Sequence, residues 1–204
     1  MIKEIFESYG FSLSEKEIKS FEIYKNLLIE WNQVINLTAI IDEREIIIKH
    51  FIDSYSICKK VFDNNKVKTV LDMGTGAGFP GIIAGILNPN VEFDLVDSVN
   101  KKVTFVEEVV ASLKLKNVHP KHHRLNQSNS SKRVYDIVIS RAFMKPPKLV
   151  HFAKRYVAKG GFHTMLLTEN QVNNFSEEIK KYSPEILKYP YEGKDRYVLK
   201  FYNN

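Results

Sequence analysis

The sequence predicts a doubly wound α/β fold with a helical extension at its N-terminus. From residue 67 onward, apolar runs of strand length alternate with helical stretches, and a cluster of glycines follows the first run. The segment before residue 67 has helical periodicity instead. With 204 residues and 44% hydrophobic content, the chain can bury the core of one main domain. We expect a helical cap over residues 1–64 and a compact sheet domain over residues 65–204.

The N-terminal segment carries the signals of two helices. Ser14 and Glu17 form a Ser-x-x-Glu capping box, and apolar residues then recur at helical spacing as far as Ile35. After the turn segment NLTAI, a second helical stretch covers residues 43–61. These two stretches define the predicted helical cap.

The remaining chain alternates between predicted strands and helices. The strands are VKTVL (67–71), VEFDLVD (91–97), VYDIVIS (134–140), GFHTMLL (161–167) and DRYVLKFY (195–202). A helix is expected after the glycine cluster, where Pro80 suits a first turn, and others over 100–113, 148–158 and 170–181. Gly160 and Gly161 are expected to close the helix over 148–158. This alternation is typical of a mostly parallel sheet with helices on its faces.

Composition and charge narrow the class of protein. The single cysteine, Cys58, has no partner for an internal disulfide, and no apolar run is long enough for a transmembrane helix. We therefore expect a cytoplasmic protein that does not engage a membrane. Residues 1–50 hold six Lys/Arg and nine Asp/Glu, whereas residues 131–160 hold eight Lys/Arg and one Asp, a net charge of +7. This segregation favours a polyanion partner such as nucleic acid, with an ordinary solvated surface as the alternative.

The stretch LDMGTGAGFPG (71–81) is the strongest functional signal. Glycines between a strand and a helix allow a tight turn and a close approach to a ligand beyond the carboxyl end of the strand. The spacing also matches the dinucleotide pattern, but Asp72 would repel a pyrophosphate and could pair with a cationic cofactor. This favours S-adenosylmethionine, with a carboxylate that caps loop amides as the alternative role for Asp72. Asp97, at the end of the next strand, is placed to accept hydrogen bonds from a ribose.

Several motifs resemble those of one known family. They are WNQVINLTAI (31–40), HFIDSY (50–55), LDMGTGAGFPG (71–81), LVDSVNKK (95–102) and VISRA (138–142). The chain resembles the small-subunit ribosomal RNA guanine-N7 methyltransferases, historically called glucose-inhibited division protein B. The resemblance implies a class I methyltransferase, with a Rossmann-like domain over residues 65–204 behind the helical cap. It implies methyl transfer from S-adenosylmethionine to N7 of a guanine in the 530-loop region of 16S rRNA.

Together, the residues and the resemblance give a set of expected cofactor contacts. They are Asp72, Gly74, Gly76, Gly78, Phe79, Asp97, Leu125, Asn126 and Arg141. Two positions depart from the family pattern. Arg124-Leu125-Asn126 stands where the family has Arg-Ala-Glu, so the adenine contact there has lost a charge. Leu167-Thr168 stands where the family has Lys-Gly.

The expected chemistry needs no general base, because guanine N7 carries a lone pair and no proton. Arg141 is the expected catalytic residue, positioning the cofactor carboxylate or a substrate phosphate through two hydrogen bonds. The alternative is an arginine that pairs with Asp53 or Asp72 to hold the cap against the sheet. His50 and Asp53, one helical turn apart, could face the site or form a surface pair.

Basic residues are expected to contact the rRNA backbone: Lys101, Lys102, Arg124, Lys145 and Lys148. His119, His122 and His123 invite a metal interpretation, but no Cys, Asp or Glu joins them and we expect no metal. The expected partner is 16S rRNA or a precursor of the small ribosomal subunit, and the expected state is a monomer. The alternatives are a methyltransferase of another substrate, an NAD-linked enzyme, and an RNA-binding protein whose cofactor site has decayed.

Overall fold

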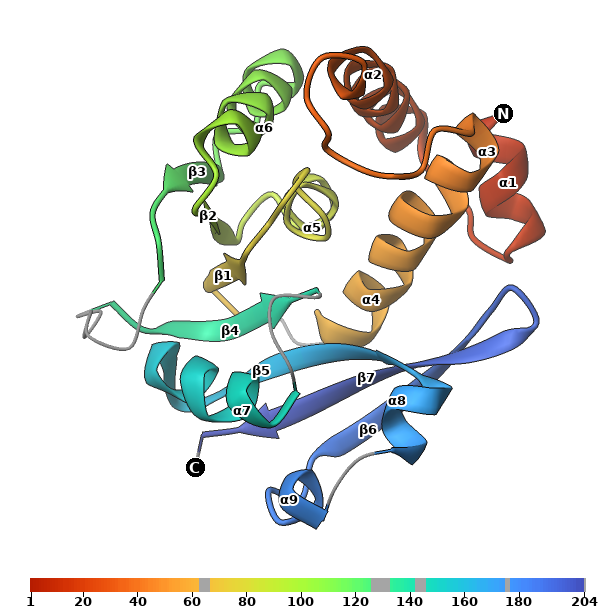
Figure 1. Cartoon of the computed structure of the whole chain (residues 1–204). Helices are drawn as coiled ribbons and strands as arrows, with labels where there is room; N and C mark the ends of the chain where they lie inside the picture. The colour runs from red at the N-terminus through yellow and green to blue at the C-terminus, as the bar shows by residue number, and fades with distance from the viewer. Residues whose placement is uncertain (63–66, 126–132, 142–145, 175–176, 204) are drawn as a thin grey trace.

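A computed structural model describes residues 1–62, 67–125, 133–141, 146–174 and 177–203. Its strands form a seven-stranded sheet with the order β3-β2-β1-β4-β5-β7-β6 (Figure 1). β1 pairs in parallel with β2 and β4, while β7 runs antiparallel to both β5 and β6. The strands are β1 Thr69–Met73, β2 Glu92–Asp97, β3 Val118–His122, β4 Tyr135–Ser140, β5 Val157–Thr168, β6 Glu185–Tyr191 and β7 Lys194–Tyr202.

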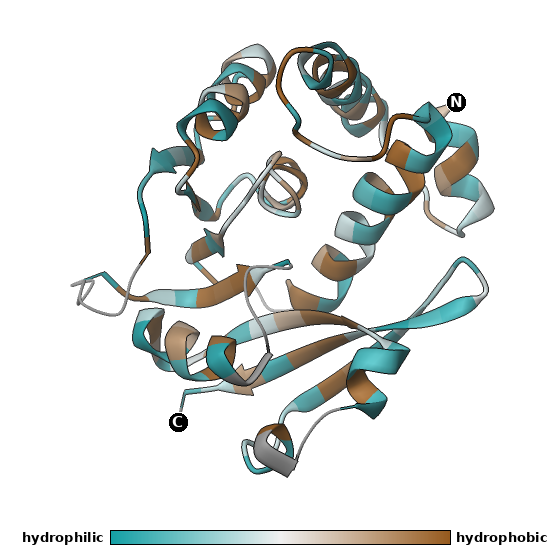
Figure 2. Ribbon diagram, viewed as in Figure 1, coloured by the Kyte–Doolittle hydropathy of each residue, from teal (hydrophilic) through white to brown (hydrophobic). Residues whose placement is uncertain are grey.

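Helices cover the sheet in two layers, each with its own apolar core. The helices are α1 Ile2–Ser8, α2 Glu15–Asn32, α3 Glu43–Ile46, α4 Asp53–Val61, α5 Gly81–Leu87, α6 Asn100–Leu113, α7 Pro146–Ala153, α8 Glu169–Asn173 and α9 Glu177–Lys180. One core joins α1, α2, α4, α5 and α6 to one sheet face, and the other joins α7 and α9 to the opposite face. The alternation of strand side chains explains this division, because Val70 belongs to the first core and Leu71 to the second. Figure 2 shows the resulting apolar stretches of β4 and β7 in the middle of the molecule.

The N-terminal helices fold as predicted, with one addition and one irregularity. The capping box of Ser14 and Glu17 is present at the start of α2. α1 was not predicted, although Ile2, Ile5 and Phe6 bury its inner face. Between α3 and α4 the predicted continuous helix contains a π-helical segment, η1, over Ile47–Ile52. Such widened turns occur often at functional sites, and this one contributes to the site described below.

The structure corrects two predicted helices in the C-terminal half and adds two strands, β3 and β6, that were not predicted. The predicted helix over 148–158 ends at Ala153, a short 3₁₀ turn follows, and Gly160 and Gly161 lie inside β5. The predicted helix over 170–181 is replaced by the short helices α8 and α9. β6 was not predicted, because its pattern mixes exposed and buried residues and includes Pro190.

The helical cap and the sheet share one core instead of packing as separate bodies. Phe6, Phe21 and Phe51 belong to the same apolar cluster as Phe93 of β2 and Val198 of β7. The expected domain boundary between residues 64 and 65 lies outside the described residues. Within the described part of the chain, every helix falls short of the length and apolarity that a transmembrane span requires.

Candidate active site

The glycine loop lies where the carboxyl ends of β1, β2 and β4 meet, as the sequence predicts (Figure 1). Gly74, Gly76 and Gly78 have φ angles of 68°, 60° and 92°, which favour glycine over any residue with a Cβ. At Gly78 an added Cβ would also come within 2.8 Å of the Tyr24 hydroxyl. The loop is therefore a tight turn whose shape depends on these glycines.

Most backbone N–H groups of the loop donate to acceptors within the protein. The amides of Gly74 and Thr75 donate to the Val96 carbonyl over 2.8 and 3.1 Å. The amides of Gly78 and Phe79 donate to the Thr75 carbonyl. A dinucleotide site instead directs such amides at a pyrophosphate. The geometry thus agrees with the sequence argument for a cofactor without a phosphate at this loop.

Asp72, at the end of β1, is fully buried behind the loop. Its Oδ2 accepts hydrogen bonds from the Thr75 hydroxyl at 2.7 Å and the Gly81 amide at 3.0 Å. This is the loop-capping role that the sequence left open as the alternative. Its Oδ1 is buried without a hydrogen-bond partner among the described residues. Burial raises the pKa of this carboxyl to about 6, against the opposing effect of its two hydrogen bonds.

Asp97 ends β2 at the mouth of a pocket of about 440 Å³. The pocket is lined by Gly74, Val96, Asp97, Ser98, Val99, Lys102, His123, Arg124 and Leu125. Asp97 also accepts hydrogen bonds from the amides of Gly76 and Val99, each at 2.9 Å, so it ties the loop to the start of α6. The pocket brings together five of the residues expected at the cofactor or RNA site: Gly74, Asp97, Lys102, Arg124 and Leu125. Asn126 lies outside the described residues.

Phe79, at the end of the loop, is buried between two aromatic rings of the helical cap. Its ring stacks on Tyr24 with centroids 4.8 Å apart and on His50 with centroids 5.0 Å apart. Tyr24 also donates from its hydroxyl to the Ala77 carbonyl over 2.5 Å. The cap therefore holds the glycine loop through two rings and one hydrogen bond. Phe79 is 3% exposed, so its side chain belongs to the core between the cap and the loop.

Arg141 follows β4 and reaches into η1 and α4. It donates from Nη1 to the Lys49 carbonyl over 3.2 Å and from Nη2 to Nδ1 of His50 over 3.0 Å. Its Nη1 lies 3.5 Å from Oδ2 of Asp53, whose Oδ1 accepts a hydrogen bond of 2.7 Å from the Tyr189 hydroxyl. The pairing with Asp53 is one that the sequence allowed for an arginine joining cap and sheet. The guanidinium also lies 5.7 Å from the centre of the Phe79 ring.

The bond to Arg141 fixes the protonation of His50. A guanidinium only donates, so Nδ1 must accept and the ring proton must lie on Nε2, which is 2.8 Å from the Thr38 hydroxyl. Burial and the nearby Arg141 charge lower the pKa of His50 to about 4. His50 is therefore neutral at pH 7, with both ring nitrogens engaged inside the protein.

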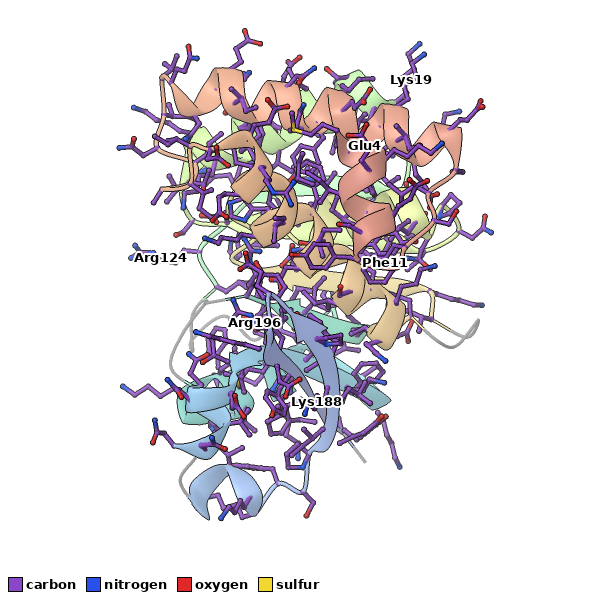
Figure 3. All side chains as sticks on the ribbon, turned by 90° about the vertical axis from the view of Figure 1, so that its right-hand side faces the viewer. Glu4, Phe11, Lys19, Arg124, Lys188 and Arg196 are labelled. Atoms are coloured by element: carbon purple, nitrogen blue, oxygen red, sulfur yellow. The ribbon has the colours of Figure 1, made fainter. Side chains whose placement is uncertain are left out.

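The predicted RNA contacts occupy two places. Lys101 and Lys102 lie in the first turn of α6, close to Arg124, which projects outward in Figure 3. Lys148 is exposed on α7, on the other side of the sheet, and Lys145 lies outside the described residues. Within the basic stretch, Arg133 is exposed and lies 3.2 Å from Asp94, whereas Arg141 belongs to the partly buried network described above.

The three histidines for which we considered and rejected a metal site have partners within the protein. His119 is 2.6 Å from Glu92, and His122 is 3.2 Å from the Ser98 carbonyl. Among the described residues, no group of three or more His, Cys, Asp or Glu side chains is arranged to hold a metal ion.

Sequence reasoning missed Tyr24, Thr38 and Tyr189 as parts of the site. Each contacts a site residue through its hydroxyl, but Tyr24 and Tyr189 do so across 53 and 136 residues of sequence. No local pattern marks a side chain whose partner is that remote. Thr38 belongs to the motif WNQVINLTAI, which was the one available signal.

The strand order, the glycine loop and the carboxylate at the end of β2 define a class I methyltransferase fold. Solved structures agree. A precorrin-6Y C5,15-methyltransferase from Geobacter metallireducens is 13% identical, with a TM-score of 0.58, over 74% of this chain and 87% of that one. A methyltransferase from Pyrococcus furiosus is 18% identical, with a TM-score of 0.60, over 75% of this chain and 82% of that one. At these identities the likeness concerns the fold alone.

The chain belongs to the family of rRNA small subunit methyltransferase G, whose family model matches residues 17–191. A relative of that name from Lachnoclostridium phytofermentans is 43% identical over 158 residues, which is 76% of this chain and 65% of the relative. Another, from Desulforamulus reducens, is 39% identical over 188 residues, or 91% of this chain and 76% of the relative. The chain thus spans about two thirds to three quarters of these relatives' length. Membership confirms the predicted enzyme class and its cofactor, S-adenosylmethionine.

Proposed function

We propose that this protein transfers a methyl group from S-adenosylmethionine to N7 of a guanine in the RNA of the small ribosomal subunit. The observation that carries the proposal is the family match over residues 17–191. The position of the glycine loop and Asp97 at the carboxyl ends of β1 and β2 supports it, because that edge is where such folds bind their ligands.

The residues around the loop suit this cofactor. The pocket beside Asp97 and Leu125 has the size of a nucleoside, and Asp97 presents a carboxylate to ribose hydroxyls. The buried Oδ1 of Asp72 and the guanidinium of Arg141, which pairs with Asp53, are two further polar groups near the loop. When bound, S-adenosylmethionine supplies an electrophilic methyl group. Arg141, held by His50 and Asp53, would position the cofactor through its carboxylate.

The engagement of His50 within the protein fits methylation at N7. His50 is the nearest imidazole to Arg141, and both its nitrogens are engaged. Attack by an in-plane lone pair releases no proton at the attacking atom, so the rate depends on positioning and on the surrounding charges. Among the described residues, the cations and aromatic rings of the site stand beside the carboxylates of Asp53, Asp72 and Asp97, each of which accepts hydrogen bonds from the protein.

The basic rim of Lys101, Lys102 and Arg124 is the proposed contact to RNA phosphates. The target base must be accessible or splayed out, because side chains cannot read the deep groove of A-form RNA. We further propose that the enzyme acts as a monomer, in the cytoplasm where its rRNA substrate is assembled. Whether free rRNA or a precursor particle is methylated is decided by the following assay.

The test uses radiolabelled S-adenosylmethionine with small-subunit rRNA, or with small-subunit particles, from a strain that lacks the enzyme. Labelled 7-methylguanosine after nucleoside digestion is the expected result, and Arg141→Ala is expected to abolish it while the fold persists. Lys19→Ala, on the exposed side of α2, is the matched control. Transfer to another nucleoside, or undiminished transfer by Arg141→Ala, contradicts the proposal or its assignment of Arg141.

A further inference from the structure

A second cleft lies outside the candidate active site, between the N-terminal helices and the hairpin of β6 and β7. Its volume is about 620 Å³. Figure 3 views the side on which Phe11 of the cap lies above this hairpin. The lining residues are Ser8, Tyr9, Phe11, Ser56, Lys59, Lys60, Tyr189, Pro190, Tyr191, Glu192 and Gly193.

A tight turn forms one wall of the cleft and an aromatic pair supports the other. Glu192 and Gly193 form the two-residue turn between β6 and β7, with φ angles of 47° and 70°, as in the tight turns that suit strand twist. On the opposite wall, Phe11 packs on Tyr55 of α4 with ring centroids 4.9 Å apart.

The lining combines aromatic rings with ammonium groups. Tyr9 and Phe11 are half-buried and present apolar faces, while Lys59 and Lys60 are exposed on α4. Lys59 Nζ lies 5.2 Å from the centre of the Tyr55 ring, so a positive charge stands at the edge of an aromatic wall. Glu192 is the one carboxylate of the lining, so the lining carries a net positive charge.

This chemistry selects a ligand that is both planar and anionic. A purely apolar segment would make no use of the two ammonium groups, and a bare phosphate would leave the rings uncovered. A nucleotide has a π-face that can stack on Tyr9 or Phe11 and a phosphate that can pair with Lys59 and Lys60. Its hydrogen-bond donors can also donate to the Glu192 carboxylate.

The cleft is also connected to the site of Arg141. Tyr189, which lines the cleft, donates its hydroxyl to Asp53 over 2.7 Å, and Asp53 lies 3.5 Å from the Arg141 guanidinium. A strand seated in the cleft would therefore contact a residue one hydrogen bond away from the carboxylate that holds Arg141.

We propose that this cleft binds a nucleotide of the RNA substrate outside the target guanine, by stacking on Tyr9 and Phe11 and by phosphate contact with Lys59 and Lys60. This inference rests on the proposed function, which supplies RNA as the ligand. It adds a second anchoring point on the side of the cap, separate from the basic rim at Lys102 and Arg124.

The experiment measures filter binding of a radiolabelled small-subunit rRNA transcript to the full chain over a series of salt concentrations. Saturating S-adenosylhomocysteine keeps the cofactor site occupied. The variants are Tyr9→Ala and the double variant Lys59→Met with Lys60→Met. Lys19→Met, on α2 and remote from the cleft in Figure 3, is the control. Thermal melting and calorimetric cofactor binding identify any variant that fails to fold.

Tyr9→Ala is expected to raise the Kd for RNA about tenfold, the typical effect of removing a base-stacking ring. The double lysine variant should flatten the slope of log K against log salt by about 1.4, since two single-strand phosphate contacts are lost. Lys19→Met should leave both quantities unchanged. Folded cleft variants that bind RNA with the wild-type Kd and slope overturn the proposal.

Two further results distinguish a failure of the cleft proposal from a failure of the proposed methyltransferase function. A wild-type protein that methylates guanine N7 while its cleft variants bind RNA normally overturns the cleft and leaves the function intact. A protein whose RNA binding depends on Tyr9 and Lys59 but which forms no 7-methylguanosine overturns the function and leaves the cleft intact.

A competition experiment tests the occupant of the cleft. Guanosine monophosphate should compete with the transcript for the cleft at high concentration. Stoichiometric binding of that nucleotide without displacement of RNA contradicts an RNA strand as the occupant.

Discussion

Two substitutions at His50 test whether its Nδ1 positions Arg141. In the wild-type protein Nδ1 accepts from the guanidinium over 3.0 Å, and Nε2 faces Thr38 at 2.8 Å. Asparagine places a carbonyl oxygen at the δ position, so His50→Asn keeps an acceptor for Arg141. Glutamine places its oxygen one atom further out, toward Thr38, so His50→Gln removes that acceptor. Both variants lose the same stacking on Phe79, and each is therefore the other's control.

The size of the effect follows from the bonds that remain. A hydrogen bond from a charged donor contributes about 1.5–3 kcal/mol, and about 1.4 kcal/mol corresponds to tenfold in rate. Arg141 keeps its contacts with the Lys49 carbonyl at 3.2 Å and with Asp53 at 3.5 Å. The free energy lost with the His50 bond should therefore lie near the lower bound of this range. We expect kcat/KM for S-adenosylmethionine to fall about tenfold to thirtyfold in His50→Gln and less than about threefold in His50→Asn.

The assay is steady-state methyl transfer with labelled cofactor and saturating rRNA, with melting temperatures measured in parallel. Because His50 is buried, both variants are expected to melt earlier than the wild type by similar amounts. Equal activities of the two folded variants would refute the idea that an acceptor at the δ position holds Arg141.

Three further predictions concern the loop and buried ionisable groups. Asp97→Ala should raise the Kd for S-adenosylmethionine in calorimetry, and an unchanged Kd would remove Asp97 from the site. Gly81→Ala should lower the free energy of unfolding by about 1–3 kcal/mol in urea titrations, because its Cβ would lie 2.6 Å from Asp72 and 2.7 Å from Leu95. The pKa values of His50 and His163 are lowered to about 4 by burial, so the unfolded chain binds more protons and stability should fall as pH drops from about 6.5 to 4. The pKa of Asp72 is raised to about 6, so this carboxyl opposes the loss of stability at low pH. In denaturant titrations Asp72→Asn should therefore steepen the dependence of stability on pH and stabilise the fold at pH 7. A shallower pH dependence would contradict the raised pKa of Asp72.

Local signals were sufficient to predict most of the fold. The capping box at Ser14 and the apolar period of α6 depend on neighbours within a few residues, and both elements have the predicted bounds or nearly so. β6 was missed because an edge strand with exposed residues and a proline lacks a strand pattern. The π-helical segment η1 could not be predicted, since its widened turn accompanies a contact between the Lys49 carbonyl and Arg141, which is remote in sequence.

The candidate site was predictable where topology alone determines position. Asp72 and Asp97 end neighbouring strands, so their proximity to the glycine loop follows from the parallel sheet. Their hydrogen-bond partners did not follow, and the structure uses Asp72 to bind Thr75 and Gly81. His50 and Asp53 face the site, which was one of the two alternatives that the sequence allowed. Tyr24 was unpredictable as a loop contact, because only tertiary packing brings α2 onto Phe79.

The π-helical segment η1 also affects how this chain can change in length. An α-helical turn holds fewer residues than a π turn, so one deletion within residues 47–52 would let the helix close into a regular one. The residues that follow would keep nearly the same phase about the helix axis, because the widened turn had accommodated the extra residue. Asp53 would therefore stay on the side of Arg141. The same deletion in a regular helix such as α2 would turn every following residue by about 100°.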